Sequence, residues 1–197
     1  MNITFNNADI RFYFSFQCPY SYISWELMKT ILKDAKLTVQ PINIGLNPPG
    51  NSKFHFREIW SEKRWQRLIA DAKALEIPMS KPEKYVSDLT SARAIELYGP
   101  YNAEDYISSI FKGFFVNGVD ISAPSALKYH LQADGIDSSI FSAAIEDVAT
   151  EKAFNEQTLL WGHHRIRTIP TIECQDDRIC GLIEKSPLER HLRSIMD

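Results

Sequence analysis

The N-terminal part of the chain follows a strand, helix, strand pattern. In the segment 10–16, Phe12, Phe14 and Phe16 recur at every second position, which is the period of a strand. From 21 to 35 the apolar residues recur every three or four positions, as in a helix. The segment 37–44 alternates again, and Pro41 indicates an edge strand or a bulge because proline cannot donate a ladder hydrogen bond. The pattern predicts a βαβ unit, in which a crossover helix joins two parallel strands.

The middle of the chain changes to helical spacing from about residue 58 to residue 158. Breakers such as Ile77-Pro78 and Ala123-Pro124 separate the helices. Two apolar stripes each need a partner surface to cover them. The first stripe comprises Ile59, Trp60, Leu68, Ile69, Ala72 and Leu75, and the second comprises Tyr106, Ile110, Phe111 and Phe114. The run 139–161 predicts a further long helix, either continuous or broken.

The end of the chain returns to strands. Segments 170–173 and 179–183 flank a polar turn at 175–178, which predicts an antiparallel hairpin. A helix follows at about 187–195.

The order of these elements predicts an α/β fold. It contains a mixed four-stranded sheet, and an all-helical insertion interrupts the chain that forms it. We expect residues 1–50 and 138–197 to form the domain that carries the sheet, and residues 51–137 to form the helical insertion.

Composition and charge are those of a folded globular protein. Hydrophobic residues make up 44% of the chain and charged residues 24%. The net charge of -3 gives no general basic field that would attract nucleic acid. The N-terminal residues lack the basic patch and apolar run of a secretory signal, and no later stretch is long and apolar enough to cross a bilayer. We expect a cytoplasmic protein that binds neither nucleic acid nor membranes.

The three cysteines are too few and too unevenly spaced for a disulfide framework or a zinc site, so we expect no metal. Cys174 and Cys180 flank the predicted hairpin turn. One strand register would bring them face to face, whereas another would point them to opposite faces of the sheet. Free thiols in the core or at the surface are favoured in a reducing cytoplasm.

Cys18 lies between the first predicted strand and the helix after it. Unpaired N–H groups and the helix dipole at such a position favour an anion, so we expect a lowered thiol pKa and a reactive thiolate. Pro19 suits the first helical position. Ser21 could donate a hydrogen bond to the sulfur, and it could also satisfy backbone donors at the helix start, since the two roles are compatible. The alternative for Cys18 is a buried and inert thiol.

The segment Phe12-Tyr13-Phe14-Ser15-Phe16-Gln17-Cys18-Pro19-Tyr20-Ser21-Tyr22-Ile23 resembles the active-site entry of the DsbA-like thioredoxin family. That family includes disulfide oxidoreductases of the DsbA and FrnE types, kappa-class glutathione transferases and 2-hydroxychromene-2-carboxylate isomerases. Redox members usually carry Cys-Pro-x-Cys, whereas the transferases and isomerases typically carry Ser-Pro-Tyr-Ser. This chain combines the first cysteine of one group with the Pro-Tyr-Ser of the other.

A second segment, 165–171, resembles the family stretch that contains a cis-proline, with Arg165 and Thr168 in place of glycines. The resemblance implies a thioredoxin-like fold, a cis Ile169-Pro170 bond beside the thiol, and pairing of the Ile169 backbone with an incoming peptide or glutathione. The residues that it places at the binding surface are Pro19, Tyr20, Asn47, Thr168, Ile169 and Pro170. The Asp-Arg pair with which transferases and isomerases grip glutathione is missing from 181–187.

Three functions stay open from the sequence. The first is a monothiol oxidoreductase that acts through Cys18 on disulfides or glutathione adducts, with an outside thiol such as glutathione as co-substrate because position 21 is serine. The second is a glutathione-dependent isomerase or transferase, in which Cys18 or Ser21 holds a glutathione thiolate that adds to an electrophile. The third is a non-catalytic module with a peptide groove. The expected partners are small-molecule thiols, disulfides or electrophiles, with no metal or nucleotide cofactor, and the resemblance also implies a homodimer.

Overall fold

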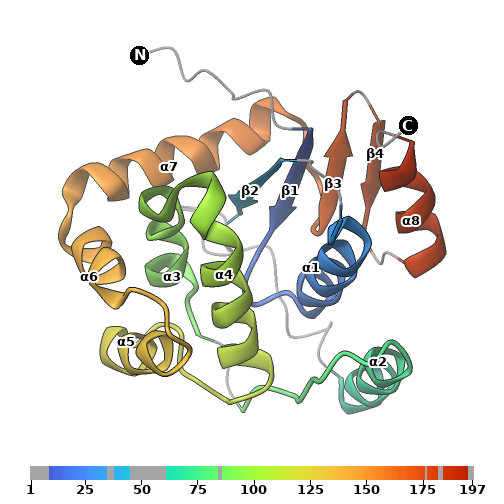
Figure 1. The fold of residues 1–197 in the computed structure, drawn as a ribbon, viewed down its shortest axis with the longest axis horizontal. Coiled ribbons are helices and arrows are strands. Elements are labelled where there is room, and N and C mark those ends of the chain that lie inside the picture. The colour runs from blue at the N-terminus through green and yellow to red at the C-terminus, as the bar shows by residue number, and fades with distance from the viewer. Residues whose placement is uncertain are drawn as a thin grey trace.

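The structure of the chain is a computed structural model that describes residues 9–34, 38–44, 61–83, 86–175, 177–181 and 184–194. Asn47 and the apolar positions Ile59 and Trp60 lie outside these residues. The elements, shown in Figure 1, are β1 (Ile10–Phe14), α1 (Pro19–Leu32), β2 (Val39–Asn43), α2 (Glu62–Ala74), α3 (Leu89–Arg93), α4 (Ile95–Phe115), α5 (Pro124–Ala133), α6 (Ser138–Glu146), α7 (Val148–His163), β3 (Thr171–Cys174), β4 (Asp177–Cys180) and α8 (Lys185–Arg193). No helix of this part of the chain is long and apolar enough to cross a membrane.

The four strands form one mixed sheet in the order β2-β1-β3-β4. β1 pairs with β2 in parallel, whereas β3 pairs with β1 and with β4 in antiparallel fashion. The mixed four-stranded sheet and the parallel βαβ unit predicted from the sequence are confirmed. Pro41 lies in β2, and β2 is an edge strand, as the missing N–H of proline requires.

Several strand boundaries differ from the sequence pattern, most clearly at the end of β1 and in the β3–β4 hairpin. β1 ends at Phe14 and not at residue 16, because Ser15 belongs to a turn in which the Cys18 N–H donates to its carbonyl oxygen at 3.1 Å. The hairpin turn is shorter than the predicted 175–178, since Cys174 already pairs with Asp177. Gln175 in this turn has a φ of 54°, in the left-handed region that tight hairpin turns require.

The predicted long helix 139–161 is broken into α6 and α7 at Asp147, whose backbone is extended. The Asp147 carboxylate caps the first turn of α7, because Oδ1 accepts from the Ala149 N–H at 2.8 Å and Oδ2 from the Thr150 hydroxyl at 3.0 Å. The last helix begins at Lys185, two residues before the predicted start. The division into an insertion at 51–137 and a sheet domain on either side stays a prediction.

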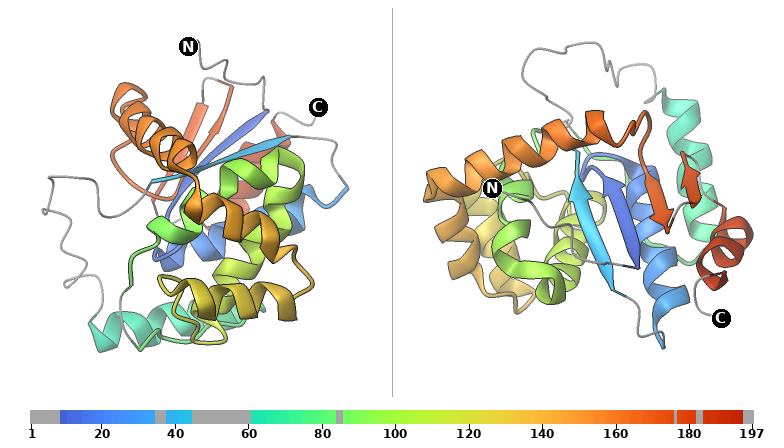
Figure 2. Two further views of the ribbon diagram at one scale, coloured as in Figure 1. Left: turned by 90° about the vertical axis from the view of Figure 1, so that its left-hand side faces the viewer. Right: turned by 90° about the horizontal axis from the view of Figure 1, so that it is seen from above.

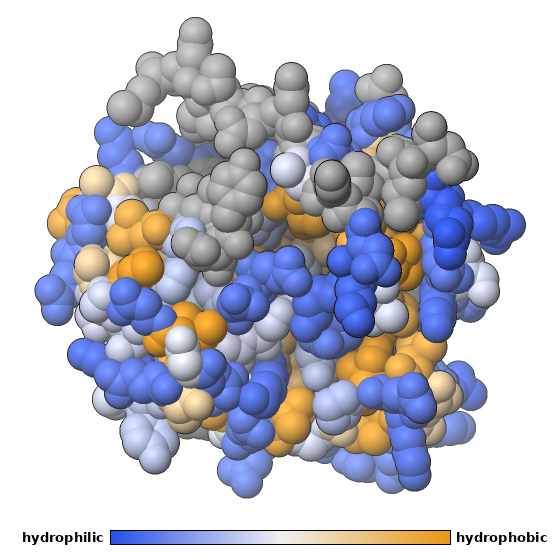
Figure 3. All heavy atoms as spheres, viewed as in Figure 1, coloured by the Kyte–Doolittle hydropathy of each residue, from blue (hydrophilic) through white to orange (hydrophobic). Residues whose placement is uncertain are grey.

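The sheet has two differently covered faces (Figure 1 and Figure 2). Phe12 and Phe14 of β1 join the main hydrophobic core with α1 and α4. Tyr13 points to the other face, where it packs with Ile166 and against the His164 ring after α7. Hydrophilic residues spread over much of the described surface in the view of Figure 3, with smaller hydrophobic areas between them. The helices on the Phe12 face therefore share one core with the sheet.

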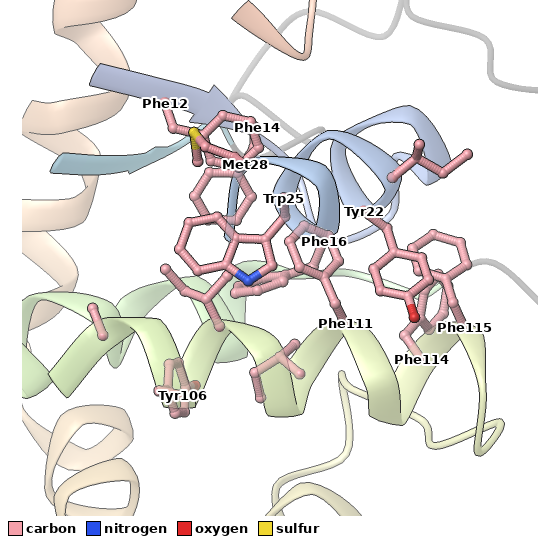
Figure 4. Packing of buried hydrophobic residues seen from close by; sticks show 14 of the residues in the cluster. Phe12, Phe14, Phe16, Tyr22, Trp25, Met28, Tyr106, Phe111, Phe114 and Phe115 are labelled. Atoms are coloured by element: carbon pink, nitrogen blue, oxygen red, sulfur yellow. The ribbon is translucent and has the colours of Figure 1, made fainter. Parts of the chain in front are cut away.

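Aromatic rings join α4 to the start of the chain (Figure 4). Phe111 of α4 lies with its ring centroid 5.7 Å from that of Phe14, 5.2 Å from that of Phe16 and 5.6 Å from that of Tyr22. Phe111, a member of the second apolar stripe predicted from the sequence, is therefore covered by β1, α1 and the turn between them. This contact fixes α4 beneath the turn that leads into α1.

Helix α2 ends in a conformation that favours glycine. The N–H of Glu76 donates to Lys73 O and that of Ile77 to Ala72 O, and Glu76 has a φ of 59°. Glu76→Gly is therefore expected to raise the free energy of unfolding by about 1 kcal/mol, because glycine adopts this conformation without a Cβ clash. Glu104→Gly, at an exposed position within α4, is expected to lower it by about 1 kcal/mol. Urea denaturation of the two variants measures both changes. A change of the same sign in the two free energies of unfolding would contradict the left-handed conformation of Glu76.

Candidate active site

Cys18 is the N-cap residue of α1, and α1 begins at Pro19. The start lies two residues before the helical pattern of the sequence, because Pro19 occupies the first helical position and the Tyr22 N–H already donates to Cys18 O at 3.1 Å. Cys18 is only 4% exposed. The thiol is therefore held at the helix start but inside the protein.

The thiol faces the segment that the resemblance assigned to its partner. The Ile169-Pro170 bond is cis, which confirms that expectation. The Cys18 S–H donates to the carbonyl oxygen of Ile169, with 3.9 Å between sulfur and oxygen. Thr168 beside it is exposed, Ile169 is half-buried and Pro170 is buried. The structure thus brings Cys18, Pro19, Ile169 and Pro170 together, although 151 residues separate Cys18 from Ile169.

Burial decides the protonation of Cys18. Removal of the thiolate from water raises the pKa of Cys18 above its ordinary value. The Ser21 side chain and the N–H groups of Ser21 and Tyr20 at the start of α1 act in the opposite direction, but they do not outweigh burial. The expectation of a lowered pKa, drawn from the helix start, is therefore wrong in this structure.

Ser21 is fully buried beneath the thiol. The Ser21 hydroxyl is close enough to the thiol to lower the pKa of Cys18. Ser21 Oγ nevertheless has no hydrogen-bond partner of normal geometry among the described residues. The Ser21 hydroxyl accepts no hydrogen bond from a backbone donor at the helix start among the described residues, so the interpretation that it satisfies these donors is wrong. Tyr20 is half-buried and packs against the edge of the core.

Asp88 is a component of the site that the sequence did not reveal. It precedes α3 and is 1% exposed. Its Oδ2 accepts hydrogen bonds from Ser15 Oγ at 2.7 Å and from the Phe16 N–H at 3.0 Å, in the turn before Cys18. Burial raises the pKa of Asp88. The hydrogen bonds from Ser15 and Phe16 lower this pKa, but their effect is smaller than that of burial. An aspartate directly before Leu89-Thr90-Ser91 is typical of a helix N-cap, so this role of Asp88 has no signal in the sequence.

The other two cysteines lie on the β3–β4 hairpin, Cys174 in β3 and Cys180 in β4. All three are free. Cys174 pairs with Asp177 and Cys180 with Thr171, so the two cysteines point to opposite faces of the hairpin and the face-to-face register is excluded. Cys174 is buried in the core, where burial raises its pKa to about 12, and Cys180 is exposed.

No group of three or more His, Cys, Asp or Glu side chains that could hold a metal ion occurs among the residues that the structure describes. The polar groups close to Cys18 are a hydroxyl, backbone amides and one carboxyl. Such groups can bind and orient a thiol or thiolate. The arrangement is therefore suited to sulfur chemistry.

Comparisons with a family model and with solved structures find similarity to the same family of proteins. The model of the DSBA-like thioredoxin domain family matches residues 9–193. The structure of a 2-hydroxychromene-2-carboxylate isomerase superposes with a TM-score of 0.78 at 21% identity, covering 94% of this chain and 95% of that chain. A probable DsbA oxidoreductase from Streptomyces coelicolor gives a TM-score of 0.79 at 14% identity, with coverages of 94% and 88%. The cytosolic disulfide reductase DsbM from Pseudomonas aeruginosa, solved with GSH, gives 0.67 at 13% identity, with coverages of 94% and 97%.

A comparison with the sequences of curated proteins finds no match. The identities to the solved structures are low, so these similarities show a shared fold. The thioredoxin-like fold implied by the resemblance is thereby confirmed.

Proposed function

The chain belongs to the family of DSBA-like thioredoxin domains, and from this premise we propose that it is an oxidoreductase that works through the single thiol of Cys18. The observation that carries the proposal is the position of that thiol before α1, facing the carbonyl oxygen of Ile169 in the cis Ile169-Pro170 pair at 3.9 Å. Ser21 stands where a second cysteine would close a disulfide across the first turn of the helix. An outside thiol must therefore complete the reaction.

The proposed substrate is a mixed disulfide of glutathione with a second thiol, R. The Cys18 thiolate attacks the glutathione sulfur, so that a Cys18–glutathione disulfide forms while the bond to R breaks and R leaves as a thiolate that takes a proton from water. A second glutathione thiolate then attacks this disulfide, which releases oxidised glutathione and restores Cys18. The net change converts the mixed disulfide and one glutathione into the thiol of R and oxidised glutathione.

The binding surface proposed for glutathione lies on both sides of the thiol. Pro19 and Tyr20 supply one side and Thr168, Ile169 and Pro170 the other. The half-buried Ile169 and the exposed Thr168 support this role, because a peptide-like ligand needs an accessible backbone to pair with.

The test of this function is glutathionylation of Cys18 as a function of pH. Oxidised glutathione is expected to add one glutathione to Cys18, as located by peptide mass spectrometry, and reduced glutathione is expected to remove it. Because burial raises the pKa of Cys18, the rate of addition should keep increasing with pH above the ordinary thiol range and should not level off near neutral pH. Rates over a pH series measure this.

Two results would count against the proposal. An adduct on the exposed Cys180 with none on Cys18 would assign the reaction to a surface thiol. An adduct on Cys18 that reduced glutathione does not remove would show that an outside thiol does not complete the reaction at this site.

A second candidate is a glutathione-dependent isomerase or transferase. It is supported by two neutral donors at the site, because burial favours the S–H form of Cys18 and Ser21 Oγ has no other partner among the described residues. Both groups would donate to the thiolate of a bound glutathione, which would then attack an electrophilic carbon. Cys18→Ser would keep a donor and retain this activity, whereas it would abolish the disulfide chemistry.

The remaining proposals follow the sequence. We propose that the protein works in the cytoplasm on small-molecule thiols, disulfides or electrophiles, and that it forms a homodimer. The similarity of the fold to that of DsbM, a cytosolic disulfide reductase, supports the proposals of a cytoplasmic location and of a thiol or disulfide substrate.

A further inference from the structure

Arg167 is exposed two residues before Ile169, whose carbonyl oxygen faces the thiol of Cys18. We propose that Arg167 is a specificity-determining residue, whose guanidinium binds a carboxylate of the glutathione moiety while the sulfur of that moiety reacts at Cys18. The proposal rests on the proposed function of Cys18, and it names the part of the substrate that the protein recognises. Its test compares disulfides and does not need turnover.

The buried neighbour Ile166 fixes the direction of the Arg167 side chain. Ile166 packs with Tyr13 and Ile42 against the sheet. Arg167 is exposed, so the two side chains point to opposite sides of the segment that joins α7 to β3. Two residues of chain span at most about 7 Å, so the backbone of Arg167 lies within that distance of Ile169. A long and flexible side chain at this position can reach a ligand that pairs with the Ile169 backbone.

The charge of Arg167 is not neutralised by another side chain of the described residues. Arg167 makes no ion pair within the part of the chain that the structure describes. The stretch 157–172 contains no Asp or Glu. The next acidic residue, Glu173, is buried and already pairs with Arg11 and Arg178. In a chain with a net charge of -3, this segment therefore presents a local positive charge close to the thiol.

Glutathione carries a carboxylate on each side of its sulfur. One ends the glycine residue, and the other belongs to the γ-glutamyl residue, and both of these residues adjoin the central cysteine. A guanidinium binds a carboxylate through two parallel hydrogen bonds, which adds geometric selectivity to the attraction of charge. Whichever way the glutathione backbone runs past Ile169, one of its carboxylates lies on the side of Arg167.

The test compares a disulfide that has carboxylates with one that has none. In a Cys180→Ser background, which lacks the exposed thiol, the Cys18 thiolate forms a disulfide with one half of the probe while the other half leaves as a thiolate. The probes are oxidised glutathione and the uncharged hydroxyethyl disulfide. Arg167→Gln is expected to slow the reaction with oxidised glutathione about three- to tenfold and to leave that with hydroxyethyl disulfide unchanged. Mass spectrometry of the Cys18 peptide over time measures both rates.

Lys128→Gln is the matched control. It removes one positive charge from an exposed position of α5, a helix that packs against α4 and α6, and it should change neither rate.

Oxidised glutathione esterified at both glycine carboxylates identifies which carboxylate binds. If Arg167 holds the glycine carboxylate, the ester reacts with the parent protein as slowly as oxidised glutathione reacts with Arg167→Gln. If Arg167 holds the γ-glutamyl carboxylate, the ester reacts with the parent protein at the full rate and is slowed by Arg167→Gln. Both results support the proposal.

An unchanged rate with oxidised glutathione in Arg167→Gln would overturn the proposal. An equal fall with both disulfides would do the same, because the effect would then come from packing, and an equal fall in Lys128→Gln would assign it to net charge.

If Cys18 reacts with neither disulfide, the proposed function fails. Calorimetric binding of reduced glutathione to the wild-type protein then decides the role of Arg167, since this binding must weaken by the same factor in Arg167→Gln. Selectivity for oxidised glutathione that depends on Arg167, in a protein that turns over no glutathione adduct, would refute the proposed function while supporting this role of Arg167.

Discussion

Cys18→Ser is expected to reduce the turnover of glutathione mixed disulfides to the uncatalysed rate, a loss of about a thousandfold or more. A serine hydroxyl cannot form the mixed disulfide on which the proposed reaction depends. Ser21 cannot replace the thiol for the same reason, and Cys174 is buried on β3 with its pKa raised to about 12. Steady-state reduction of a small glutathione adduct, coupled to consumption of glutathione, measures the loss.

Cys180→Ser is the matched control, because it removes a free and exposed thiol from β4 while leaving the site intact. It should turn over at the wild-type rate. The fold should survive the exchange at Cys18, since serine is close to cysteine in size and its hydroxyl can donate to Ile169 O in place of the S–H. Wild-type disulfide turnover in Cys18→Ser would refute the monothiol mechanism, and retained isomerase or transferase turnover would favour the second candidate.

The location of Cys18 was predictable from the sequence because it depends on local patterns. The aromatic alternation marks β1, and Pro19 marks the start of α1, so the thiol had to lie between a strand and a helix. Its approach to Ile169 is a long-range contact that local patterns do not encode. This contact and the cis bond were predicted only from the resemblance of residues 165–171 to a family segment.

The protonation of Cys18 was not predictable, because it depends on how deeply the folded chain buries the thiol. The helix start acts in the expected direction, but a site that is 4% exposed removes the thiolate from water, and this effect is larger. Asp88 could not be found for a similar reason. It lies 73 positions from Ser15, and only the packing of the segment before α3 against the β1–α1 turn brings the two together.

The boundaries of helices and strands were also not fully predictable from the sequence. Apolar spacing through 139–161 fits one helix or two, and the break at Asp147 is set by the hydrogen bonds that its carboxylate makes to Ala149 and Thr150. The strand at 10–16 loses its last two positions because the turn before Cys18 needs Ser15. In the first place the hydrogen bonds of a polar side chain decide where a helix ends, and in the second a backbone hydrogen bond of the turn decides where a strand ends. The spacing of hydrophobic residues indicates neither.

Phe111→Ala is expected to lower the free energy of unfolding by about 3 to 5 kcal/mol, a large share of the roughly 5 to 15 kcal/mol that holds a typical domain together. The Phe111 ring is fully buried and contacts Phe14, Phe16 and Tyr22, so its removal leaves a cavity between α4 and the start of the chain. Urea denaturation followed by tryptophan fluorescence measures the loss.

Leu97→Ala provides the control on the same helix, because Leu97 is 44% exposed and its truncation should change the free energy of unfolding by less than about 1 kcal/mol. Phe16 links this prediction to the active site, since its ring contacts Phe111 and its N–H donates to Asp88. Phe111→Ala should therefore also increase the alkylation rate of Cys18 under conditions in which most of the protein is still folded. Equal losses of stability in the two variants would show that α4 does not pack against β1 and α1 as described.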